Sequence, residues 1–246
     1  MCLLMSIHGP KAASKTREFV TADQPELDFP TYYVASGFDH PKWPVITSGK
    51  ALSVALPCWG LIPNWVKTTE EATRIRNQTL NARGETIASK PAFRQSAKSN
   101  RCIILLDGFF EYYKRDDKSY PFYIHLRGEE VFLVAGLCAA WVDPRSQETV
   151  STFSLVTIEA NGMMAAIHND KKRMPAILTD QEALRWLEPA ESVEELQGLL
   201  QPHDIADLTA HPVSRVVGSH SRERNVATTQ DRFEYPELGG MNALTG

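Results

Sequence analysis

Five short apolar runs between positions 101 and 158 constrain the fold more strongly than any other feature of this chain. They occupy residues 101–106, 109–113, 121–126, 131–137 and 152–158. Each run has the length and side-chain content that favour a β-strand. Asp107-Gly108 predicts a bend or bulge, and residues 116–119 predict a hairpin tip. A turn at Arg127-Gly128 joins the next two runs, so antiparallel pairing is expected.

The expected helices are short and lie around these strands. Capping-box signatures, in which a hydroxyl residue is followed three positions later by Glu, occur at Thr68-x-x-Glu71, Thr179-x-x-Glu182 and Ser192-x-x-Glu195. Short helices are also expected to open near Lys90 and over 162–169, the latter with Asn161 as its N-cap. Residues 1–50 show little periodicity and predict a loop-rich segment with short strands.

These patterns predict an α+β fold with one domain, residues 2–235, and a flexible C-terminal tail, residues 236–246. The domain is expected to be built on a mixed, mainly antiparallel, barrel-like β-sheet with short peripheral helices. The length of 246 residues and the 43% hydrophobic content are ordinary for a globular chain of this size.

Charge is distributed unevenly along the chain. The net charge of −4 argues against a protein that is basic overall and binds nucleic acid through that charge. Residues 64–101, however, contain eight basic and three acidic side chains, a local net charge of +5. This basic stretch is compatible with a surface that faces phosphates, and also with a solvated face that carries helix ion pairs.

No segment has the length and apolar character of a membrane span or the layout of a secretory signal. We therefore expect a cytoplasmic protein, associated with the nucleoid in a bacterium. The four cysteines, Cys2, Cys58, Cys102 and Cys138, are dispersed and have no His at zinc-binding spacing. Neither a metal site nor a cofactor is expected, and the last three cysteines are predicted to be small buried apolar residues in a reducing compartment.

Cys2 has a chemistry of its own if Met1 is removed. The α-amine and the thiol of an N-terminal cysteine form a 1,2-aminothiol, with pKa values near ~8 and ~8.5, so both are partly nucleophilic at neutral pH. An amine condenses with an aldehyde to a Schiff base, and the neighbouring thiol then closes a five-membered thiazolidine. Taken alone, Cys2 is more readily explained as an incidental terminal residue.

If the aldehyde is masked as a cyclic hemiacetal, an acid and a base must open that ring and transfer protons. Glu111 and His168 can supply these groups. Glu111 lies in an aromatic strand, where desolvation raises a carboxyl pKa, unless it points to solvent. His168 lies near the end of a short helix, where the dipole favours a protonated imidazole, although a capping or core histidine is an alternative. Asn81 and Arg83 lie in the basic stretch and are also compatible with a turn and a surface charge.

A series of motifs in fixed order resembles the SRAP family, the SOS-response-associated peptidases or abasic-site processing proteins. The motifs are Met1-Cys2, Trp59-Gly60-Leu61-Ile62-Pro63-x-Trp65, Asn81-Ala82-Arg83-x-Glu85-Thr86, Lys90-Pro91-x-Phe93-Arg94, Arg101-Cys102, Asp107-Gly108-Phe109-Phe110-Glu111, Ala135-Gly136-Leu137 with Trp141, Ala160-Asn161, Ile167-His168, Arg173-Met174-Pro175 and His211-Pro212-Val213-Ser214. They run over residues 2–220, nearly the whole chain.

The resemblance implies a sensor that shields abasic sites in single-stranded DNA by a covalent thiazolidine through Cys2. It implies that Asn81 orients this nucleophile and that Glu111 and His168 form the acid/base pair. It also implies weak lyase chemistry through the Schiff base, and exposure of Cys2 by autoproteolysis, for which an aminopeptidase is an equally good route. The residues assigned to DNA contacts are Trp65, Arg83 and, from the same basic stretch, Arg94. The expected partner is single-stranded DNA containing abasic sites, and the expected state is a monomer without metal or membrane.

The chain departs from the family pattern in three places. Leu3-Leu4 follows Cys2 where many members have Gly-Arg, so a basic contact beside the nucleophile is missing. The usual Asn-x-Ala-Pro loop is Tyr33-Val34-Ala35-Ser36, and residues 169–172 are an addition whose two lysines offer a phosphate contact. Two other functions remain open: an N-terminal-nucleophile cysteine peptidase or amidohydrolase, and a non-covalent reader of damaged or modified DNA.

Overall fold

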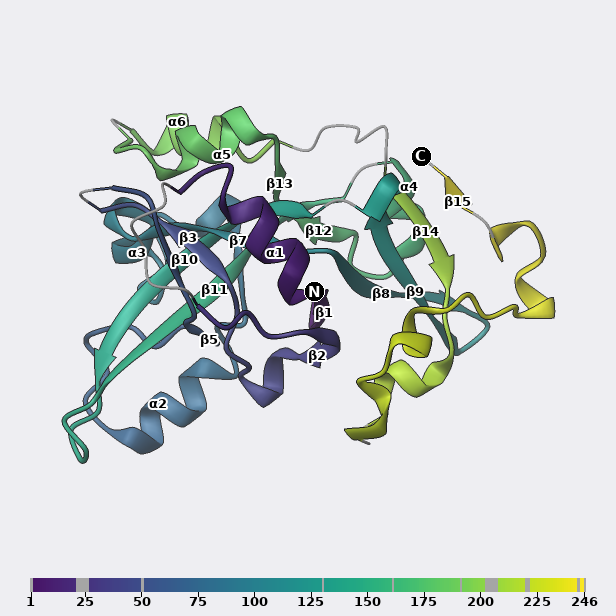
Figure 1. The fold of residues 1–246 in the computed structure, drawn as a ribbon, viewed down its shortest axis with the longest axis horizontal. Coiled ribbons are helices and arrows are strands. Elements are labelled where there is room, and N and C mark those ends of the chain that lie inside the picture. Colours follow the sequence, from purple (N-terminus) through teal and green to yellow (C-terminus); the bar gives the residue numbers. More distant parts are fainter. Residues whose placement is uncertain are drawn as a thin grey trace.

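The structure is a computed structural model and describes residues 2–20, 27–49, 51–129, 131–160, 162–190, 192–201, 208–219, 222–242 and 244–245. Met1 and Asn161, on which two of the predictions depend, lie outside these residues. Within the described residues the chain forms two sheets with short helices around them (Figure 1). Pairing is antiparallel except where two short strands run parallel to a long one. This confirms the predicted α+β fold on mixed, mainly antiparallel sheet.

The first sheet has the order β15-β14-β9-β8-β1-β2. Its strands are β1 (Leu4–Ile7), β2 (Tyr32–Ser36), β8 (Gly108–Arg115), β9 (Lys118–Leu126), β14 (Leu208–Pro212) and β15 (Leu244–Thr245). The hairpin predicted at residues 116–119 joins β8 to β9, with Arg115 opposite Lys118. Asp116 and Asp117 both have positive φ angles, of 49° and 59°, as tight hairpin turns require.

The second sheet has the order β12-β11-β10-β7-β3-β4, with β13 on β10 and with β5 and β6 on β11. Its strands are β3 (Val45–Thr47), β4 (Ser53–Ala55), β5 (Cys58–Trp59), β6 (Asn81–Arg83), β7 (Arg101–Leu106), β10 (Phe132–Val142), β11 (Thr149–Glu159), β12 (Arg173–Pro175) and β13 (Ile177–Leu178). The long β10–β11 hairpin lies at the left of Figure 1 and carries the two parallel strands on its β11 edge.

The chain passes from one sheet to the other at Asp107, between β7 and β8. A Cβ atom on Gly108 would lie 2.2 Å from the Tyr123 ring, so only glycine allows β8 and β9 to approach this closely. The turn at Arg127-Gly128 likewise connects β9 and β10 in different sheets, not a hairpin. Because the strands divide between two sheets at these points, the sheet is not closed as a barrel, and the barrel-like prediction is wrong.

The N-terminal segment is more regular than its sequence predicts. It forms β1, the helix α1 (Gly9–Thr16), β2 and β3, and β1 is an inner strand between β8 and β2. Met5 and Ile7 of β1 are completely buried. Pairing with strands distant in the chain, which local periodicity does not report, stabilises this segment. The label N in Figure 1 accordingly lies near the centre of the molecule.

The remaining helices are short and mostly begin where the capping patterns predict. They are α2 (Thr69–Arg76), α3 (Arg94–Ser99), α4 (Gly162–Ile167), α5 (Asp180–Leu187) and α6 (Val193–Gly198). Thr68, Thr179 and Ser192 each accept a hydrogen bond from the amide three residues later. None of the helices in the described ranges has the length and apolar character needed to cross a bilayer.

The expected C-terminal tail contacts the first sheet at its described residues. Pro236–Asn242 forms short 3-10 turns, and Leu238 is 3% exposed in the core. Leu244–Thr245 pairs with β14. The flexibility of this segment stays a prediction.

Candidate functional site

The structure brings together the four residues to which the sequence assigns chemistry. Cys2 lies two residues before β1, and β1 pairs with β8, which carries Glu111. Asn81 opens β6 on the edge of β11, and His168 directly follows α4, which contacts β8. Three strands from the two sheets and the helix α4 therefore position this candidate site.

Cys2 is buried, with 1% of its surface exposed. Its Sγ donates a weak hydrogen bond to the main-chain carbonyl of Leu4, at 3.7 Å. Burial raises the pKa of the Cys2 thiol well above its ordinary value, and the negative charge of Glu111 raises it further. The thiol is thus held in its neutral form in this state of the chain.

Asn81 holds the backbone of Cys2. Its side-chain Nδ2 donates a hydrogen bond of 2.8 Å to the Cys2 carbonyl oxygen. Its Oδ1 is buried and has no hydrogen-bond partner within the described residues. Asn81 therefore fixes the main chain at Cys2 and keeps an acceptor available for a nearby donor.

Glu111 is only 4% exposed, on a strand whose register places it opposite Phe122. Burial raises the pKa of the Glu111 carboxyl to about 7, although the positive charge of Lys171 opposes this shift. The carboxyl group is consequently able to give or take a proton near neutral pH, which an exposed glutamate does not do.

His168 lies 3.6 Å from Glu111, measured between Nδ1 and Oε2. The same Nδ1 is 2.8 Å from the carbonyl oxygen of Arg173, so it carries a proton and donates to that oxygen. Burial lowers the pKa of His168, which favours the neutral imidazole at pH 7. The helix position favours a protonated imidazole, whereas burial of His168 acts in the opposite direction, as expected for the alternative of a core histidine.

Sequence reasoning assigned no role to the ion pair between Arg173 and Glu85. The Arg173 guanidinium donates to both carboxylate oxygens of Glu85, at 2.6 and 3.0 Å, and to the Thr157 carbonyl. Glu85 follows β6 and Arg173 opens β12, so this pair ties the Asn81 strand to the loop that orients His168. Both residues occur in the motifs quoted above, which was the available signal.

The residues predicted to contact DNA lie in different places. Arg83 is exposed, two positions after Asn81 on β6, so both side chains emerge on the same face of the strand. Trp65 is 46% exposed and its Nε1 donates to the Pro91 carbonyl at 3.4 Å. Arg94 opens α3 and lines a separate hollow with Lys98 and Arg101. The structure thus groups Arg83 with the candidate site, and DNA contact by all three residues stays a prediction.

The additional residues 169–172 are tied to the end of β8. The Asn169 side chain exchanges two hydrogen bonds with the Lys114 backbone, at 2.7 and 3.0 Å. Asp170 forms an ion pair of 2.6 Å with the Lys114 ammonium group. These contacts hold the segment at the rim of the site, where Lys171 is close enough to act on the pKa of Glu111.

Within the described part of the chain, no group of three or more His, Cys, Asp or Glu side chains could hold a metal ion. The four cysteines are free thiols, and Cys58 and Cys138 are half-buried, so only Cys102 among the three non-terminal cysteines is fully buried as predicted. The four residues of the candidate site bring together a thiol, a carboxyl group, an imidazole and an amide.

Comparison with known proteins reveals similarity over most of the chain. The model of the family described as SOS response associated peptidase (SRAP) matches residues 1–220. The abasic site processing protein YoqW of Bacillus subtilis is 40% identical over 163 residues, which cover 65% of this chain and 69% of YoqW. The abasic site processing protein HMCES of Xenopus tropicalis is 32% identical over 180 residues, which cover 65% of this chain and 52% of HMCES.

Solved structures show the same fold. A protein from Bacteroides thetaiotaomicron superposes with a TM-score of 0.83 at 35% sequence identity, and covers 95% of this chain and 100% of its own. A protein from Bordetella bronchiseptica superposes with a TM-score of 0.71 at 23% identity, over 87% of this chain and 100% of its own. The second similarity, at this identity, concerns the fold alone.

Proposed function

The chain belongs to the SOS response associated peptidase (SRAP) family, and on this premise we propose that it captures abasic sites in single-stranded DNA through Cys2. Relatives named abasic site processing proteins support an abasic-site function. The observation that carries the covalent mechanism is the hydrogen bond from Asn81 to the Cys2 carbonyl beside a carboxyl group with a pKa near 7.

The reaction begins with removal of Met1, by autoproteolysis or by an aminopeptidase. An abasic deoxyribose is mostly a cyclic hemiacetal, which must open to an aldehyde before an amine can attack it. Protonated Glu111 donates a proton to the ring oxygen while the hemiacetal hydroxyl loses one, so the C1′ carbonyl forms. A buried carboxyl with a raised pKa suits this step because its proton is still present at neutral pH.

Capture then proceeds in two bond-forming steps. The Cys2 amine adds to C1′ and one water molecule is lost, which leaves a Schiff base. The Cys2 Sγ adds to the same carbon, and the thiol proton passes to the nitrogen, so a neutral thiazolidine closes. The raised pKa of the Cys2 thiol keeps this proton on sulfur until the imine has formed. His168, neutral and near Glu111, accepts and returns protons between these steps.

Asn81 positions the nucleophile throughout. Its Nδ2 holds the Cys2 carbonyl, and its buried Oδ1 is an acceptor suited to the α-amine that Met1 removal creates on the same residue. Arg83, on the same face of β6, is placed to pair with a phosphate of the bound strand. The Schiff base also permits β-elimination, so weak lyase activity is part of the proposal.

The test is a denaturing gel of the purified protein with a single-stranded oligonucleotide that carries one abasic site. Intact masses of protein and adduct are measured alongside. A shifted band that requires both the abasic site and Cys2, with Met1 absent, supports the covalent mechanism. If protein confirmed to lack Met1 gives no such band, the mechanism is wrong, and peptide turnover or non-covalent DNA binding becomes the function to test.

A further inference from the structure

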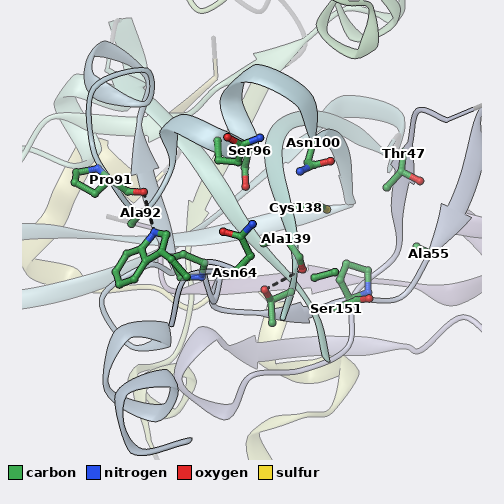
Figure 2. A pocket seen from close by; sticks show the side chains of 16 residues that line it. Thr47, Ala55, Asn64, Pro91, Ala92, Ser96, Asn100, Cys138, Ala139 and Ser151 are labelled. Carbon is green, nitrogen blue, oxygen red and sulfur yellow. Dashed lines mark hydrogen bonds between the residues drawn. The ribbon is translucent and has the colours of Figure 1, made fainter. Parts of the chain in front are cut away.

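A second cavity lies away from the four chemical residues. It has a volume of about 300 Å³ and is lined by residues of α3, β10 and β11 and by the segment that contains Trp65 (Figure 2). Figure 2 shows Asn64 in the middle of this cavity, between Ala92 on one side and Ala139 on the other. Pockets for small ligands have volumes of about 300–1,000 Å³, and this cavity is at the lower end of that range. A cavity of this size suits a single ring system.

We propose that this cavity binds an unpaired base of the same DNA strand, a few nucleotides from the abasic site; this inference rests on the function proposed above. The first support is the origin of the lining. Seven of its residues come from the basic stretch 64–101, namely Asn64, Trp65, Pro91, Ala92, Gln95, Ser96 and Asn100. The basic stretch of the chain thus forms much of the cavity wall, while none of the described residues that line the cavity is charged.

The second support is the chemistry of that lining. Asn64, Gln95 and Asn100 contribute carboxamides, each of which offers both a donor and an acceptor. Such groups match the mixed donors and acceptors on the edges of unpaired bases. Trp65, 46% exposed and hydrogen-bonded to Pro91, presents an indole at the cavity on which a base can stack. A neutral, amide-rich cavity with one exposed indole favours a base over a phosphate.

The third support is the position of the cavity relative to Asn81. β5 and β6 lie along the same edge of β11, with Cys58 beside Thr152 and Asn81 beside Leu155. Ser151 and Thr152 line the cavity. They lie three or four residues along β11 from Leu155, the partner of Asn81. At about 3.3 Å per residue this is roughly 10–13 Å. A stacked strand advances about 3.4 Å per nucleotide, so the base lies within about four nucleotides of the abasic site.

The experiment is a base-deletion scan. A fluorescent single-stranded oligonucleotide carries a tetrahydrofuran spacer, which lacks both base and aldehyde, at the abasic position. A second spacer replaces each of the four nucleotides on either side in turn, and fluorescence anisotropy measures Kd. We expect one position to weaken binding about tenfold, the order of a lost base stack, and the others to change it less than twofold.

Two cavity variants then test the location. Asn100→Ala removes a lining carboxamide, and Ser151→Trp fills the cavity from an exposed position on β11. In both variants, a spacer at the sensitive position should change Kd no more than a spacer at the other positions. Asn77→Ala, just after α2, and Thr73→Trp, on α2, make the same kinds of change at exposed positions outside the cavity lining and should preserve the difference between the sensitive position and the others. Circular dichroism establishes that all four variants fold.

The outcomes separate this inference from the proposed function. A flat scan with normal crosslinking on the denaturing gel overturns the base site alone. A sensitive position that survives in both cavity variants also overturns it, because the base is then bound elsewhere. Absence of crosslinking in protein without Met1 overturns the covalent mechanism, while the anisotropy scan, which needs no aldehyde, still reports on the cavity.

Discussion

The side chain of Asn81 donates a 2.8 Å hydrogen bond to the main-chain carbonyl of Cys2, although 79 residues separate them in the chain. The bond joins Cys2, two residues before β1 of the first sheet, to the first residue of β6 in the second. It fixes the position of a nucleophile that, at a free chain end, would sample many conformations. The predictions below follow from this bond and from the buried groups beside it.

Replacement of Asn81 by Ala should slow crosslinking about tenfold. One hydrogen bond is worth about 0.5–1.5 kcal/mol net, and 1.4 kcal/mol corresponds to a factor of ten. Single-turnover crosslinking to an abasic oligonucleotide measures the rate, with Asn77→Ala, at the C-cap of α2, as the matched control. Equal rates in wild type and Asn81→Ala would remove Asn81 from the mechanism.

Replacement of Cys2 by Ser should stop the reaction at the Schiff base. The α-amine remains, so borohydride should still trap a reduced adduct, but no stable adduct should form without it because the thiol no longer closes the ring. Denaturing gels with and without borohydride measure this. The control is Cys58→Ser, which alters a half-buried thiol outside the four-residue site. On both gels, with and without borohydride, this variant should behave like the wild type. A borohydride-independent band with Cys2→Ser would contradict thiazolidine formation.

The crosslinking rate should depend on the ionisation of Glu111. Because the acid form donates the proton and its pKa is about 7, the wild-type rate should lose this contribution as pH rises through 7. Glu111→Gln cannot donate, so it should react about 10²-fold more slowly and without that pH limb. Rates between pH 5.5 and 8.5 decide the matter. A limb near pH 7 that persists in Glu111→Gln would assign it to another group.

Glu111 should also make folding stability depend on pH. Its pKa rises from 4.5 to about 7 on folding, so the folded state binds the proton more tightly than the unfolded state. The free energy of unfolding therefore falls as pH increases from about 4.5 to 7, by about 3 kcal/mol, and is then constant for this group. Urea unfolding of wild type and Glu111→Gln at pH 4.5 and 8 should show the variant gaining relative stability at pH 8. If the difference in the free energy of unfolding between wild type and Glu111→Gln does not change with pH, Glu111 is not desolvated.

Arg83 should contribute to DNA affinity in a salt-dependent manner. One lost phosphate contact to a single strand reduces the slope of log K against log salt by about 0.7. Anisotropy titrations between 50 and 200 mM salt compare Arg83→Ala with Arg145→Ala, an exposed arginine near the far end of the β10–β11 hairpin that pairs with Glu70. An unchanged slope for Arg83→Ala would place its guanidinium outside the DNA path.

Local sequence predicted several elements accurately because short-range physics determines them. The run 101–106 coincides with β7, and Thr68, Thr179 and Ser192 cap the helices that their patterns predict. Prediction was poorest over residues 1–50, where β1 lies between two strands and carries no strong periodicity of its own. The two-sheet arrangement was also missed, because the change of sheet at Asp107 depends on pairing between strands that are distant in the chain.

The sequence by itself determined which chemical groups are present, namely a thiol, a carboxyl, an imidazole and an amide in ordered motifs, because residue identity and motif order need no coordinates. Only the tertiary structure decided their state. Burial raises the pKa of Glu111 to about 7 and lowers the pKa of His168. The tertiary structure also revealed that Arg173 and Glu85 connect the Asn81 strand to the loop beside His168. Solvation and hydrogen bonding are set by elements that meet only after both sheets have formed, and no local pattern encodes that meeting.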